Sequence, residues 1–141
     1  MTQQITPYLL YADAAAALDW LAAAFGFRET VRFTDDAGRV SHAEMTLGDG
    51  QIMLGEPGGD YRNPKALGGA TQLVHVYVDD VDAHCAAARA AGAEIERELA
   101  DQEYGDRNYG AVDPEGHRWY FAQRLREVPP GSWGATTPPD Q

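Results

Sequence analysis

With 141 residues, the chain is long enough for one domain or for two small modules that share a core. Its 22 acidic and 11 basic residues give a formal net charge of −11, which opposes binding to nucleic acid and to anionic membrane surfaces. No stretch could span a bilayer and the first residues lack a signal-peptide pattern, so we expect a cytoplasmic protein without membrane partners.

The first half predicts a strand, a helix and three further strands. Residues 5–27 combine a short apolar strand, which ends near Asp13, with an alanine-rich helix that Phe25 and Gly26 close. Asp at a helix start accepts backbone N–H bonds, and Gly just past the end adopts the left-handed conformation, so both are interpreted as caps. Strand-like runs separated by turns follow at 29–33, 40–47 and 51–56.

The second half repeats this order. A strand ends at Asp80, a helix follows, and Gly92 closes it. The single cysteine, Cys85, lies on this amphipathic helix and is expected to be a buried apolar side chain. Further strand-like runs lie at 93–100, 104–113 and 117–124, with a DPEG turn before the last.

Two modules, a linker and a tail are therefore expected. The first module covers 1–56, a Gly- and Pro-rich linker 57–70, the second module 71–127, and a mobile Pro-rich tail 128–141, with Trp133 as its anchor. One such βαβββ module buries too little apolar surface to be stable alone, so two should pair, either within one chain or across two chains. The predicted fold class is α+β, with a curled mixed sheet, helices outside and a cavity inside.

Alternation along the strands predicts which side chains face this cavity. In the run LVHVYV (73–78), the valines pack on the helix, which leaves Leu73, His75 and Tyr77 on the concave face. A polar set opposite an apolar one is usually a solvated face. His, Tyr and Leu suit a semi-polar pocket better, so we favour the cavity.

The same reasoning applies to the other strands. His42, Glu44 and Thr46 lie opposite an apolar set in the run 41–47. Elsewhere the predicted sets are Thr6, Tyr8 and Leu10 in the first strand, and Arg118 and Tyr120 in the last. His84 and His117 are expected at the surface, outside the cavity.

The repeated order of strand, Asp, helix, Gly and three strands, ending in DPEGHRWYF, resembles the vicinal oxygen chelate superfamily. That group includes glyoxalase I, extradiol dioxygenases, fosfomycin-resistance enzymes and bleomycin-resistance proteins. Residues 5–27, 41–56 and 104–124 are most similar to its bleomycin-resistance and PhnB-like branch, and the resemblance covers about residues 4–124. It implies a homodimer with sites at or near the interface. It says less about activity, because the fold hosts many chemistries.

The resemblance also allows a test of the metal site. Members that use a metal take four His, Glu or Gln ligands from positions that correspond here to Thr6, Met53, Leu73 and Tyr120. A register slip would replace Met53 by Leu54 or Glu56. These side chains are poor ligands for a hard divalent cation, so we expect no metal cofactor. An unusual site from His42, Glu44, His75 and Glu56 stays an alternative.

The expected function is metal-free binding of a small, cationic or aromatic molecule in the concave cavity, as in drug sequestration. The predicted ligand-binding residues are Tyr8, His42, Glu44, Met53, His75, Tyr77, Arg107, Tyr109 and Tyr120, with Tyr104, Arg107 and Tyr109 at the rim.

Two alternatives remain open. One is a lyase, isomerase or dioxygenase-type enzyme of the same superfamily, either metal-dependent or with His42 beside Glu44, or His75 with Tyr77, as general acid–base groups. The other is a dimer whose pocket is filled by its own side chains and which serves a partner protein. No catalytic residue is assigned from the sequence.

Overall fold

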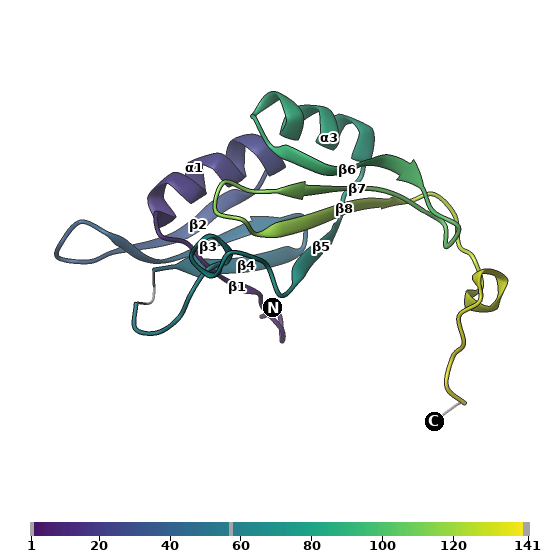
Figure 1. Cartoon of the computed structure of the whole chain (residues 1–141), viewed down its shortest axis with the longest axis horizontal. Coiled ribbons are helices and arrows are strands. Elements are labelled where there is room, and N and C mark those ends of the chain that lie inside the picture. The colour runs from purple at the N-terminus through teal and green to yellow at the C-terminus, as the bar shows by residue number, and fades with distance from the viewer. Residues whose placement is uncertain (1, 57, 140–141) are drawn as a thin grey trace.

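A computed structural model describes residues 2–56 and 58–139 (Figure 1). Met1, Pro57 and the last two residues of the expected tail lie outside the described residues. The first half contains β1 (Tyr8–Leu10), α1 (Ala14–Phe25), β2 (Arg28–Thr34), β3 (Val40–Leu47) and β4 (Gly50–Gly55). The second half contains α2 (Pro64–Leu67), β5 (Leu73–Tyr77), α3 (Val81–Ala90), β6 (Glu94–Asp101), β7 (Asp106–Val112), β8 (Arg118–Arg124) and a short 3-10 helix at Pro130–Trp133. The four-residue α2, within the expected linker, has no counterpart in the sequence-based prediction.

The strands form two sheets of the same order, β1-β4-β3-β2 and β5-β8-β7-β6. In each sheet the first strand pairs with the last in parallel, and the remaining pairs are antiparallel. The predicted α+β class with two βαβββ modules and outside helices is therefore confirmed.

The helices cover one face of the sheets and leave the other open. In Figure 1, α1 and α3 lie side by side on one side of the two sheets, and the two helices are in contact. The core between them is continuous: Phe25 at the end of α1 packs against Trp119 and Phe121 of β8, with ring centroids 5.4 and 4.6 Å apart. None of the helices in the described ranges has the length and apolar character needed to cross a bilayer.

Both predicted helix caps are present. The Asp13 carboxylate accepts from Ala16 N at 3.0 Å, and the Asp80 carboxylate accepts from Ala83 N at 3.1 Å. Gly26 ends α1 with a φ of 81°, in the left-handed region where a side chain would be strained. These aspartates thus have the structural role that the sequence indicates.

The turn between β7 and β8 joins the two modules. Its Glu115 carboxylate accepts from Ala12 N at 2.6 Å, Asp13 N at 3.0 Å and Asn63 Nδ2 at 2.6 Å. In the same turn, Asp113 accepts from the hydroxyl of Tyr11 at 2.5 Å. Burial and the Asp113 carboxylate raise the pKa of Tyr11 well above its usual value. The second module therefore binds the backbone just before the first helix.

Candidate ligand-binding site

The open face of the first sheet carries a chain of hydrogen bonds. Tyr8 lies beside Met53, which in turn faces Glu44 across the β3–β4 pair. His42 Nε2 lies 2.8 Å from Glu44 Oε2, and Gln51 Nε2 donates to Glu44 Oε1 at 2.9 Å. Since an ionised carboxylate only accepts, His42 Nε2–H donates to Glu44. In a neutral imidazole, His42 Nδ1 then accepts from the hydroxyl of Tyr8 at 2.9 Å.

This face is accessible to a ligand. The His42 and Glu44 side chains are 31% and 22% exposed, and Tyr8 is exposed beside them. Phe33 of β2, at register with His42, is 59% exposed. Partial burial and the Glu44 carboxylate raise the pKa of Tyr8, so its hydroxyl stays protonated and can donate at neutral pH. The face thus combines fixed polar groups with apolar contact area.

The open face of the second sheet is built differently. The His75 and Tyr77 rings are in edge contact, with centroids 5.0 Å apart. The Tyr77 hydroxyl donates to Asp106 Oδ2 at 2.8 Å and accepts from an Arg124 guanidinium N–H at 2.9 Å. Partial burial and the bond to Asp106 raise the pKa of Tyr77. Arg124 also lies over the Tyr77 ring, 5.6 Å from its centroid.

Tyr120 extends this second face. It is the register partner of both His75 and Gly110. A Cβ at Gly110 would lie 2.9 Å from the Tyr120 ring, so the glycine lets the ring lie close against β7. The Arg97 guanidinium lies over the Tyr120 ring, 5.8 Å from the ring centroid. The sheet therefore presents two tyrosines, each beside an arginine.

Comparison with known proteins identifies the family. The family model of the Glyoxalase/Bleomycin resistance protein/Dioxygenase superfamily matches residues 4–121. The chain belongs to this superfamily.

Its relatives cover most of the chain. An uncharacterized protein of Mycobacterium bovis is 38% identical in an alignment of 130 residues that covers 88% of this chain and 85% of the relative. The crystal structure of TioX from Micromonospora sp. ML1 is 37% identical, with a TM-score of 0.73 over 88% of this chain and 100% of TioX. TnmS3 from Streptomyces sp. CB03234, described as an antibiotic binding protein, has a TM-score of 0.63, 19% identity and coverage of 88% and 98%. This last likeness concerns the fold.

The superfamily's metal-binding positions do not carry suitable ligands here. They are occupied by a hydroxyl (Thr6), a thioether (Met53), an alkyl side chain (Leu73) and a phenol (Tyr120). A hard divalent cation takes carboxylate, imidazole or carbonyl ligands in preference to such a set. The residues present therefore do not fit the superfamily's metal ion.

The alternative ion site is not assembled either. His42 and Glu44 are in contact, but His75 lies on the other sheet. Glu56 accepts from Ala14 N at 3.1 Å and pairs with Arg39, which makes it part of the α1 cap. Within residues 2–56 and 58–139, no three His, Cys, Asp or Glu side chains form a group that could hold a metal ion.

Two predicted rim residues lie on the other side of the sheet. Tyr109 is fully buried, and its hydroxyl lies 2.6 Å from His84 Nδ1, so its predicted place at the rim is wrong. Arg107 shares this side and binds Asp82 of α3 at 3.0 Å. The reason is strand parity: Gly110 faces Tyr120, so the odd-numbered residues of β7 face the helices. Tyr104, in the preceding turn, packs instead against Trp133 of the tail, with ring centroids 5.6 Å apart.

Two histidines expected at the surface are structural. His84 Nε2–H donates to the carbonyl oxygen of Phe25 at 2.8 Å, which links α3 to the end of α1. Burial lowers its pKa. His117 is buried and donates through Nε2 to the carbonyl oxygen of Leu10 at 2.7 Å. Both tie one module to the other.

Several site residues have no counterpart in the sequence-based list. Gln51, Arg97, Asp106 and Arg124 all bond to predicted site residues. Gln51 could have been found from its place two residues before Met53 on the same strand face. The arginines carry no sequence signal, because their partners depend on register.

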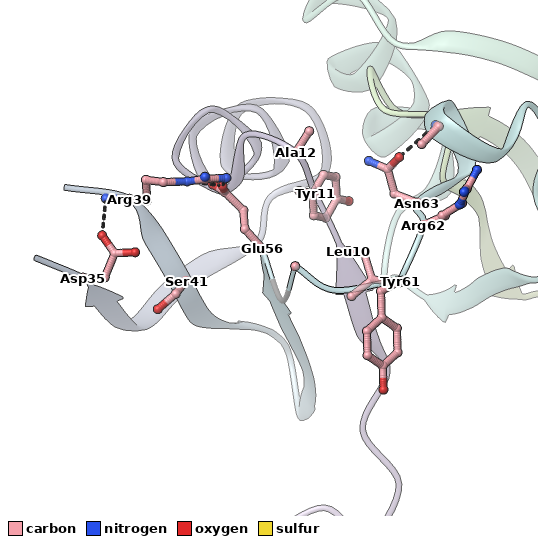
Figure 2. A pocket seen from close by; sticks show the side chains of 12 residues that line it. Leu10, Tyr11, Ala12, Asp35, Arg39, Ser41, Glu56, Tyr61, Arg62 and Asn63 are labelled. Atoms are coloured by element: carbon pink, nitrogen blue, oxygen red, sulfur yellow. Dashed lines mark hydrogen bonds and ion pairs between the residues drawn. The ribbon is translucent and has the colours of Figure 1, made fainter. Parts of the chain in front are cut away.

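A cavity of about 340 Å³ lies at the end of β1 and β4 (Figure 2). Arg39 and Glu56 point toward each other on one wall, and Tyr61 and Arg62 come from the linker on the other. A smaller hollow of about 120 Å³ shares Arg62 and adds Tyr8. The polar face of the first sheet therefore continues into a cavity beneath the linker.

Proposed function

We propose that this protein binds a small organic molecule, without a metal ion, against the open sheet faces, and sequesters it unchanged. The observation that carries this proposal is the chain Tyr8–His42–Glu44–Gln51 on an exposed face beside Phe33. Fixed donors and acceptors next to aromatic surface fit a ligand with a flat body and a few polar groups. The Glu44 carboxylate and the net charge of −11 favour a cation.

A homodimer is part of this proposal. Large apolar side chains on both open faces are exposed in the single chain: Val31, Phe33, Leu73 and Tyr77 are each at least 43% accessible. Such exposure is typical of an interface or a ligand-binding surface. If the first sheet of one copy faces the second sheet of another, the two faces enclose the ligand between them. TnmS3, described as an antibiotic binding protein, offers a precedent for this use of the fold.

Thermal unfolding with metal-free bleomycin as the cationic probe tests the proposal. A ligand at 100 times its Kd stabilises the folded state by about 2.7 kcal/mol, so saturable protection is expected. Mass spectrometry should recover the probe unchanged, and sedimentation equilibrium should give a dimer. Glu44→Gln keeps the shape and removes the charge, and Phe33→Ala removes the aromatic surface. Both should weaken protection.

Glu98→Gln, on an exposed glutamate far from the open faces, is the matched control. If bleomycin protects Glu44→Gln and Phe33→Ala against thermal unfolding as well as it protects the wild type, the binding site on the open face of the first sheet is refuted. An absence of protection by bleomycin and by other cationic antibiotics would refute the ligand class.

One observation favours a second function, acid–base catalysis. His42 is held between an acid and a phenol in one tautomer, which is the arrangement of a general base and the group that orients it. Product formation that is lost in His42→Gln, while the urea midpoint is unchanged, would establish this alternative. Recovery of every tested ligand unchanged by the wild-type protein would exclude it for those ligands.

A further inference from the structure

The seam between the two modules is closed at one end and open at the other. At the closed end, the β7–β8 turn reaches the start of α1 through Glu115. At the equivalent place in the first module, the β3–β4 turn has two residues (48–49, between the partners Leu47 and Gly50), whereas the β7–β8 turn has five (113–117, between Val112 and Arg118). Within the described ranges, no hydrogen bond joins the shorter turn to the start of α3.

The apolar residues at the two ends of the seam also differ in how deeply they are buried. Leu9 and Tyr11, on the helix side of the chain at β1, are 2% and 3% exposed. Val76 and Val78 hold the equivalent positions at β5, counted back from the capping aspartates, and are only half-buried. The longer β7–β8 turn thus covers the apolar side chains at β1. The shorter β3–β4 turn leaves the equivalent side chains at β5 partly uncovered.

The uncovered space is a cavity of about 820 Å³, a volume within the range of sites for drug-sized molecules. It has an apolar floor formed by Phe25, Phe27, Leu47, Ile52, Val74 and Val76. Its lining includes the carboxylates Asp49, Asp79 and Asp80, and no lysine or arginine. Asp80 caps α3, whereas Asp49 and Asp79 form no hydrogen bond or ion pair among the described residues.

The edge of β5 adds directional groups. Among the described strands, β5 pairs only with β8, and Val78 N donates to the carbonyl oxygen of Ala122. Because these bonds alternate along a parallel strand, the backbone N–H and C=O groups of His75 and Tyr77 point away from β8, toward this cavity. A ligand in the seam could therefore bond to the strand edge.

We propose that this seam cavity, which borders the open sheet faces at Gln51, His75 and Tyr77, is a second ligand-binding site for an amphipathic organic cation. The apolar floor takes the aromatic or aliphatic body. The unpaired carboxylates at Asp49 and Asp79 take the positive nitrogen, and the β5 edge bonds to polar groups along the body. Burial lowers the pKa of His84 in the wall, which favours its neutral form, so it does not repel the cation.

Fluorescence titration of the full chain with berberine tests this proposal, because berberine is a flat aromatic cation that brightens in apolar surroundings. Ala83 is exposed and lines the cavity, so Ala83→Trp fills the cavity at little risk to the fold. Affinity should fall more than tenfold. Ala86→Trp is the control, on an exposed position of the same helix outside the cavity lining. The double variant Asp49→Asn, Asp79→Asn should bind about fivefold more weakly.

The outcomes separate the seam from the open faces. Berberine binding that survives in Phe33→Ala and Glu44→Gln but is lost in Ala83→Trp supports the seam, whatever the bleomycin result. Binding that is lost in Phe33→Ala and kept in Ala83→Trp overturns the seam proposal and assigns berberine to the open face. The seam proposal is also overturned if Ala83→Trp and Ala86→Trp lose the same berberine affinity, or if the wild-type protein shows no saturable berberine binding.

Discussion

Removal of one buried hydroxyl at the closed end of the seam should destabilise the whole protein. Tyr11 is 3% exposed and donates to Asp113, which is itself 4% exposed and also accepts from Trp119 Nε1 at 3.1 Å. A hydrogen bond to a charged group contributes about 1.5–3 kcal/mol, and its loss here leaves a buried carboxylate short of one donor. Tyr11→Phe should therefore lower the free energy of unfolding by about 2 kcal/mol, a large share of the usual 5–15 kcal/mol.

Equilibrium unfolding in urea measures this change. The midpoint should fall while the slope is unchanged, since the variant alters no exposed area. Tyr61→Phe is the matched control, because Tyr61 is 70% exposed. Loss of its hydroxyl should lower the free energy of unfolding by less than about 0.5 kcal/mol. A double-mutant cycle with Asp113→Asn should give a coupling of about 1 kcal/mol or more. If Tyr11→Phe lowers the free energy of unfolding no more than Tyr61→Phe does, the stabilising role given to the Tyr11–Asp113 hydrogen bond is refuted.

Three further predictions concern other contacts. Glu115→Gln replaces a carboxylate that accepts three bonds and should cost about 1–2 kcal/mol in urea unfolding, against no measurable loss for the exposed Glu98→Gln. Gly55→Ala would place a Cβ against the backbone oxygen of Ser41 in β3 and should cost about 1–3 kcal/mol. Gly69→Ala meets nothing within 4 Å and should be neutral. Equal urea midpoints for the two variants would contradict the packing at Gly55. Burial lowers the pKa of His84 in the folded state, so the unfolded chain binds the proton more tightly, and stability should fall as pH drops below about 6.5; His84→Gln should flatten this part of the pH profile.

Local chemistry made the helices and most strands predictable. Asp13, Gly26 and Asp80 act at helix ends through bonds to neighbouring residues, so the sequence near them is sufficient. Alternation likewise placed His42 and Glu44 on the open face, because their apolar neighbours identify the buried side. Where one face of a strand is clearly apolar, the sequence shows which residues face the core and which face the open side.

Parity failed where both faces carry similar residues. In β7, Tyr109 and Asn108 are both buried, so neither hydrophobicity nor polarity separates the core side from the open side. The positions of His84 and His117 were missed for another reason. Each bonds to a carbonyl of the other module, at sequence separations of 59 and 107 residues, and no local pattern encodes such a partner.

The bonds between Glu115 and the residues before the first helix have a consequence for how the chain folds during synthesis. During synthesis, the first half leaves the ribosome with the amides of Ala12 and Asp13 lacking their carboxylate and with Phe25 lacking the rings of β8. These contacts form only after the last strand has been translated, so the halves should not mature one after the other as independent domains. If the two halves are expressed as separate chains, we expect them to fold only when both are present. The gene can therefore be divided between the halves, but one half alone should not function.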